Sequence, residues 1–106
     1  GEGLMPGYMT DKAIEEIRAI HGLSQRVNGE GRAHQEALLR FMTEHAVEIK
    51  KLFEEGNVHY VRESGDLAVL CMEMIMSAGA DPDGILAERL PRFRERMSGR
   101  SGASRG

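Results

Sequence analysis

The chain has few of the residues that stabilise a small domain by means other than aliphatic packing. Its 106 residues include one cysteine, three prolines, three phenylalanines, two tyrosines and no tryptophan. Because a disulfide needs two cysteines, Cys71 excludes an intramolecular one, and its apolar neighbours indicate a small hydrophobic packing residue. Stability must therefore come from packed aliphatic side chains, helped by association with another chain.

Long apolar runs and an excess of positive charge are also missing. The sequence contains no stretch of about 18 apolar residues and no signal-peptide pattern. We therefore expect a soluble cytoplasmic protein with no membrane partner. The formal net charge of −3 gives no general attraction to a phosphate backbone, so we expect no specific nucleic-acid partner.

The composition divides the chain into one domain and two short ends. Residues 1–9 resemble a tag or a flexible N-terminus, and residues 10–97 form the expected helical domain. Residues 98–106 are only Gly, Ser, Ala and Arg, so we expect a flexible tail that stays mobile unless a partner orders it. A domain of this size is near the limit for a single stable core, which favours an oligomer.

Apolar residues recur at helical spacing in four segments and alternate as in a strand in none. The expected helices cover residues 11–27, 32–55, 58–78 and 82–97. Thr10 and Asn57 are candidate N-caps, and Asp81 followed by Pro82 is a strong helix start. Pro91 should kink or divide the last helix. The pattern predicts an all-α protein in which four helices form an up-down bundle, with the apolar third helix in the centre.

Two acidic clusters stand out within these segments. Glu44, His45 and Glu48 interrupt otherwise apolar rows of the second helix, while Glu63 and Asp66 lie one turn apart on the third. Carboxylates that face a helix–helix seam are costly unless a cation lies between them, and Mg²⁺ is a suitable hard cation. In the alternative interpretation these acids line the solvated edge of the bundle, and those on the third helix favour its N-terminal dipole.

The remaining charged and imidazole side chains give weaker signals. Arginines gather late in the sequence, where they either contact phosphates or form a solvated basic helix end, and composition alone favours the second interpretation. Glu73 is interpreted as solvated surface. No constellation involves His21, His34 or His59, and we assign them no role.

The two clusters resemble the metal-binding segments of the MazG-type all-α nucleotide pyrophosphohydrolases. That family carries Glu-x-x-Glu on one helix and Glu-x-x-Asp on the next, and Glu63-Ser64-Gly65-Asp66-Leu67 is similar to the second segment. The stretch from Ala78 to Leu90 is also similar to the family's continuation. Two departures occur: His45 stands where the family has its first metal-binding Glu, and Phe93 lies near its usual Asn.

The resemblance implies a chemistry and assigns roles to residues. The implied reaction cleaves a nucleoside triphosphate between its α and β phosphates, with Mg²⁺ or alternatively Mn²⁺ as cofactor. The implied metal ligands are Glu48, Glu63, Asp66 and His45, and Glu44 is either a further ligand or the catalytic base. The implied phosphate contacts come from basic side chains, namely Lys51, Arg89, Arg92 and Arg96.

The resemblance also implies an assembly, because members of this family build their sites between associated subunits. We therefore expect a MazG-like homodimer or a dimer of dimers that acts in nucleotide house-cleaning. The alternative is a degenerate, non-catalytic member that binds a nucleotide or metal, or that serves as a helical interaction module. His45 and Phe93 are the residues that favour this alternative.

Overall fold

The computed structural model describes the backbone of residues 7–105 and the side chains of residues 7–100, and it contains four helices. They are α1 (Asp11–Asn28), α2 (Gly31–Glu54), α3 (Tyr60–Ser77) and α4 (Pro82–Arg105). Residues 7–105 contain no strand, which confirms the all-α prediction. The first three helices begin and end within two residues of the expected bounds, whereas the last is longer. The expected tag-like residues 1–6 lie outside the described part.

Short-range signals explain where the helices begin. The Thr10 hydroxyl accepts a hydrogen bond from the Ala13 backbone N–H at 3.1 Å, so Thr10 is the N-cap of α1 as predicted. The Asp81 carboxylate accepts one from the Gly84 N–H at 3.0 Å, which fits the predicted start of α4 at Pro82.

Asn57 was predicted as the N-cap of α3, but the N-cap lies two residues later. The N-cap is His59, and the Asn57 carboxamide oxygen instead accepts a hydrogen bond from the His59 N–H at 2.9 Å. Asn57 therefore closes a local side-chain turn before the helix begins. Gly56, with a φ of 72°, supplies the left-handed residue that reverses the chain between α2 and α3.

The end of α4 differs from the prediction. The helix passes through Pro91 without dividing and continues to Arg105, eight residues beyond the expected end at residue 97. Residues 87–100 of α4 are exposed, so the carbonyl that loses its partner at Pro91 can be hydrated. The mobility expected of residues 98–106 stays a prediction.

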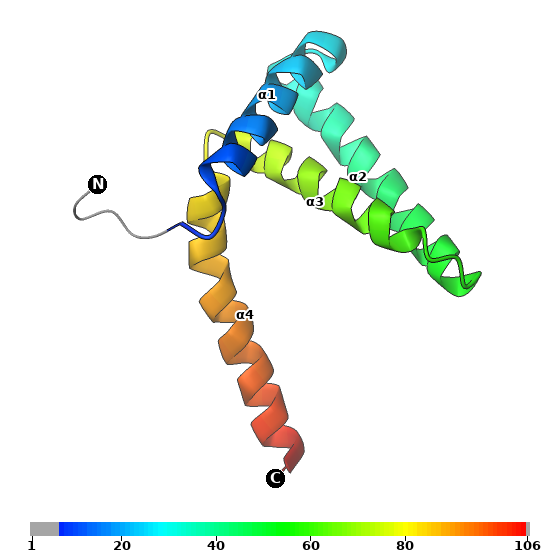
Figure 1. Ribbon diagram of the computed structural model, residues 1–106, viewed down its shortest axis with the longest axis vertical. Coiled ribbons are helices and arrows are strands. Elements are labelled where there is room, and N and C mark those ends of the chain that lie inside the picture. Colours follow the sequence, from blue (N-terminus) through cyan, green and yellow to red (C-terminus); the bar gives the residue numbers. More distant parts are fainter. Residues whose placement is uncertain (1–6, 106) are drawn as a thin grey trace, which may run out of the picture.

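The helices are arranged as an antiparallel α2–α3 hairpin with two additions (Figure 1). α1 lies across the end of the hairpin far from its turn, and α4 leaves the same end of α3 and points away. α3 contacts all three other helices, which confirms its central place. The predicted up-down packing is seen for α2 and α3, whereas α4 extends alone. None of the helices within residues 7–105 is both long and apolar enough to cross a bilayer.

The hydrophobic core is small. Within the described residues, only Ala37, Leu38 and Leu52 are buried apolar side chains outside proline. The radius of gyration is 16.7 Å, against about 13 Å for a compact domain of this length. Large apolar side chains stay exposed on every helix and in the turn before α3, among them Leu23, Val47, Phe53, Val58, Val61, Leu90, Phe93 and Met97. A single chain therefore leaves much of its apolar surface uncovered.

Candidate metal centre

The two acidic clusters meet because α2 and α3 run antiparallel from the turn at Gly56. The C-terminal half of α2 then lies beside the N-terminal half of α3, which brings His45 opposite Glu63 and Asp66. These three residues each offer one ligand atom, and the atoms lie within 4.8 Å of one another. The predicted convergence of the two clusters is therefore observed for these three side chains.

His45 is held in an orientation that suits a metal ligand. Its Nδ1 lies 2.8 Å from the Phe41 carbonyl oxygen, one turn earlier on α2. Because a carbonyl only accepts, Nδ1 must carry a hydrogen and donate it. Nε2 then faces Glu63 Oε2 at 3.4 Å and Asp66 Oδ2 at 3.9 Å. A backbone carbonyl that fixes one imidazole nitrogen and leaves the other toward the metal is the usual arrangement of ligating histidines.

The carboxylates differ in their contact with water. The Glu63 side chain is 19% exposed and that of Asp66 is 64% exposed, so the cluster lies on the open edge of the hairpin. His59, to which the sequence assigned no role, places Nε2 at 3.6 Å from Glu63 Oε1, and its side chain is about half exposed. Glu63 thus lies between two imidazoles, and the cluster is partly solvated.

The other predicted residues of α2 surround this cluster without joining it. Glu48 is half-buried one turn after His45, and Glu44 is exposed. Lys51 is exposed one further turn along the helix. Neither glutamate belongs to the group whose ligand atoms converge. The first predicted segment therefore contributes its histidine to the cluster and leaves its two acids beside it.

The predicted phosphate contacts on α4 are remote within one chain. Arg89, Arg92 and Arg96 are exposed on α4, which begins after α3 ends. Asp66 lies eleven residues before the end of α3 at Ser77, an axial distance of about 16 Å. Figure 1 shows α4 leading away from the hairpin turn. The arginines of one copy are therefore separated from the acidic cluster of the same copy.

A second cluster was missed by sequence reasoning. His34 is fully buried and Glu73 is 3% exposed, so the interpretation of Glu73 as solvated surface was wrong. Both converge with His21 in a group with ligand geometry. A signal existed for His34, which precedes the buried Ala37 and Leu38 by three and four residues and so shares their helix face. Glu73 gave no such signal, because α1 covers it only in the folded chain.

No protein-family model matches this chain, and no curated protein or solved structure matches it either.

Proposed function

We propose that this protein is a divalent-metal-dependent nucleotide pyrophosphohydrolase that converts a nucleoside triphosphate to its monophosphate and pyrophosphate, in nucleotide house-cleaning. The observation that carries the proposal is the convergence of His45, Glu63 and Asp66 from two helices on the open edge of the hairpin. The family resemblance of the segment around Glu63 and Asp66 adds to it.

The donor set fits a divalent cation. An imidazole nitrogen that is pre-oriented by the Phe41 carbonyl faces one carboxylate at 3.4 Å and a second at 3.9 Å. A nitrogen ligand among oxygens favours Mn²⁺ relative to Mg²⁺, although both accept carboxylates. When bound, the metal would neutralise phosphate charge and lower the pKa of a water molecule. Glu63, Asp66 and His45 would hold it, with Glu48 within one helical turn as a further candidate.

Two exposed side chains of α2, Glu44 and Lys51, have separate roles in this proposal. Glu44 is exposed and lies beside His45 on α2, where it can orient or deprotonate an attacking water. Lys51 lies on the same half of α2 and carries the nearest predicted phosphate contact of this chain. The partly solvated cluster leaves room for a triphosphate to reach its carboxylates.

The remaining phosphate contacts would come from a second copy. Leu90, Phe93 and Met97 recur at helical spacing along one exposed row of α4. Arg89, Arg92 and Arg96 repeat the same spacing one position earlier, so a basic row borders the apolar row. If the apolar row packs on the exposed apolar surface of another chain, the adjacent arginines lie against that chain as well. A homodimer, or a dimer of dimers, thereby completes a site that one chain leaves open.

Pyrophosphate release tests the proposal most directly. Wild type is incubated with a panel of canonical and modified nucleoside triphosphates, with Mg²⁺ and Mn²⁺ supplied separately. We expect turnover by wild type and a loss of at least about 100-fold in Asp66→Asn, because a metal ligand is removed. Glu54→Gln is the matched control, since Glu54 is an exposed acid on α2 that pairs with Lys50 at 2.9 Å away from the cluster.

Two outcomes would contradict the proposal. Absence of pyrophosphate release from every substrate with either metal rules out the hydrolase and favours the alternative of a nucleotide- or metal-binding module. A monomer in size-exclusion chromatography with light scattering at micromolar concentration argues against the shared site. The variant Phe93→Glu places a charge in the apolar row, and we expect it to weaken both association and turnover together.

A further inference from the structure

Three polar side chains from three different helices, two of them buried and one half-buried, meet at the end of the hairpin opposite its turn. His21 comes from α1, His34 from α2 and Glu73 from α3. Their side chains are 12%, 0% and 5% exposed. His21 Nδ1 lies 3.8 Å from Glu73 Oε1, and His34 Nε2 lies 4.0 Å from the same oxygen. This buried cluster is separate from the one on the open edge.

The buried cluster has atoms without partners. Among the described residues, His21 Nδ1, His34 Nδ1 and Glu73 Oε1 are buried side-chain atoms that make no hydrogen bond. The separations of 3.8 Å and 4.0 Å exceed hydrogen-bonding distance. A buried carboxylate that nothing neutralises costs several kcal/mol. A cation bound by His21 Nδ1, Glu73 Oε1 and His34 Nε2 would give two of these three atoms a partner.

The separations match those of ligands around a small metal ion. With metal–ligand bonds of about 2.0–2.2 Å, two ligands in a tetrahedral site lie about 3.3–3.6 Å apart. The observed 3.8 Å and 4.0 Å need to close by only about 0.5 Å, which side-chain torsions can provide. The two imidazole rings lie 4.9 Å apart between centroids, so both can face one ion.

Within the described residues, the surroundings of His34 are apolar except for one hydroxyl and the two other members of the cluster. Burial, and then the neighbouring His21, lower the pKa of His34, while Glu73 acts in the opposite direction. The buried surroundings therefore favour the uncharged form of His34. Its Nε2 is 2.9 Å from the Ser24 hydroxyl, which also accepts from Asn28 Nδ2 at 3.3 Å. On metal binding the Ser24 hydroxyl would give up this contact and remain beside the site.

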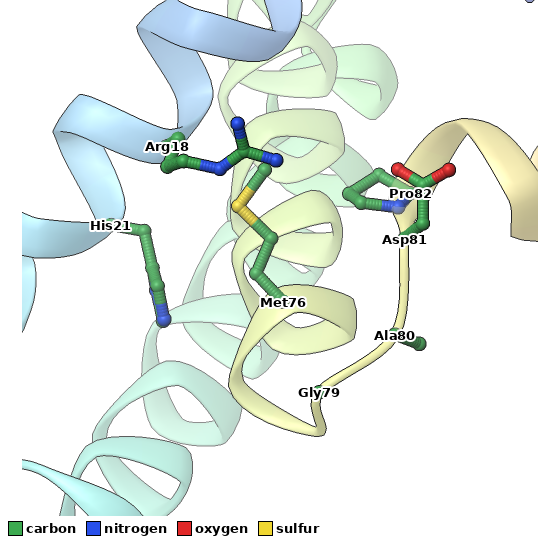
Figure 2. A pocket seen from close by; sticks show the side chains of 7 residues that line it. All are labelled: Arg18, His21, Met76, Gly79, Ala80, Asp81 and Pro82. Atoms are coloured by element: carbon green, nitrogen blue, oxygen red, sulfur yellow. The ribbon is translucent and has the colours of Figure 1, made fainter.

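The position of the cluster explains what a metal would do to the fold. α1 has no buried residue, so apolar packing holds it weakly. Its polar links to the hairpin include Ser24 with His34 and His21 with Glu73. Figure 2 shows His21 and Arg18 on α1 facing Met76 and the loop at residues 79–82 across a pocket of about 420 Å³. That pocket gives an ion a path to His21 and leaves space for a water ligand.

We propose that His21, His34 and Glu73 form a transition-metal site of the Zn²⁺ type, which fastens α1 to the α2–α3 hairpin. Two imidazoles and one carboxylate are a nitrogen-rich set that favours Zn²⁺ or Co²⁺ over Mg²⁺. The site differs from the proposed nucleotide site in its residues, its burial and its metal. Its role is structural, because the ion links three helices at a position where packing alone is weak.

Cobalt spectroscopy on the full chain tests this site. Wild type and the double variant Glu63→Gln/Asp66→Asn are stripped with a chelator, dialysed and titrated with Co²⁺. We expect one visible-absorbing Co²⁺ per chain in the double variant, displacement of Co²⁺ by Zn²⁺, and a rise of several degrees in Tm on addition of Zn²⁺. In His21→Gln and in Glu73→Gln, we expect Co²⁺ affinity to fall by at least about tenfold.

Ser24→Ala is the matched control, because it removes the hydrogen bond to His34 and leaves all three ligands. We expect it to keep the Co²⁺ spectrum and the Tm rise, with circular dichroism confirming helix content in every variant. Three results would overturn the site: no Co²⁺ bound at micromolar concentration, full binding in both His21→Gln and Glu73→Gln, or loss of the spectrum in Glu63→Gln/Asp66→Asn. None of these results depends on pyrophosphate release, so this site and the proposed enzyme activity fail or succeed separately.

Discussion

The two ends of the α2–α3 hairpin carry similar donors in different surroundings. Near the turn, His45, Glu63 and Asp66 converge where water reaches the carboxylates, and their side chains are 28%, 19% and 64% exposed. At the other end, His34 and Glu73 converge with His21 and are almost completely excluded from water. Carboxylates near the turn therefore keep contact with water, whereas the carboxylate at the other end does not.

Because the two clusters differ in exposure to water, they would place different demands on a bound metal ion. Water can solvate the exposed carboxylates, so under the proposed function an exchangeable Mg²⁺ or Mn²⁺ and an incoming phosphate would bind at the edge cluster. The buried cluster has no such compensation, and each of its charges must be neutralised within the protein. An exposed cluster suits turnover, whereas a buried one suits permanent attachment of helices.

The largest effect that separates the two ends should come from Glu73→Leu. Without metal, this change removes an uncompensated buried charge and fills the space with apolar volume, so we expect the free energy of unfolding in EDTA to rise by about 1–4 kcal/mol. With Zn²⁺ the order should reverse, because only wild type gains from the ion. Urea unfolding with and without Zn²⁺ measures both.

The matched change at the other end is Asp66→Asn. Since Asp66 is 64% exposed, we expect less than about 0.5 kcal/mol of change in EDTA. Equal effects of Glu73→Leu and Asp66→Asn would remove the distinction between a buried and an exposed cluster.

A second test exchanges one ligand of the edge cluster. His45→Glu replaces the imidazole nitrogen with a carboxylate, and oxygen ligands favour Mg²⁺. We expect the ratio of Mg²⁺-supported to Mn²⁺-supported pyrophosphate release to increase by about tenfold, with Co²⁺ binding at the buried cluster unchanged. An unchanged ratio would show that His45 does not bind the metal.

The smallest expected effect is a decrease in the free energy of unfolding at acidic pH, measured in EDTA so that no metal is bound. The lowered pKa of His34 means that, below its ordinary value of 6.5, the unfolded chain binds more protons than the folded one. Stability therefore holds above pH 6.5 and declines as pH falls toward the lowered pKa, by at most about 1.4 kcal/mol per pH unit for one proton. The facing groups are His21 and Ser24 on α1 and Glu73 on α3.

Urea unfolding at several pH values checks this slope. We expect His34→Gln to flatten it and His45→Gln to leave it unchanged, because His45 lies in the other cluster, away from His34. If stability depends on pH to the same extent in His34→Gln as in wild type, another group binds the proton.

Local signals in the sequence predicted the helices well. Apolar spacing located the first three helices within two residues, and the Thr10 cap of α1 and the Asp81-Pro82 start of α4 were correct. These signals depend on neighbours within one or two turns, which is why they can be read from the chain. The end of α4 was missed, because the Gly, Ser, Ala and Arg composition of residues 98–106 indicated a tail, whereas the helix continues to Arg105.

The spacing of Glu63 and Asp66, and of His45 among apolar rows, already marked one site, because residues three or four apart share a helix face. The sequence alone therefore determined four helices and one ligand face on each of two of them. Only the tertiary structure decided that His45 rather than Glu44 or Glu48 meets the acids of α3, and that α4 points away. It also decided that Glu73, outwardly an ordinary surface acid, is buried beneath α1 beside His21 and His34. Burial depends on which helices cover a face, and that contact joins residues far apart in the chain.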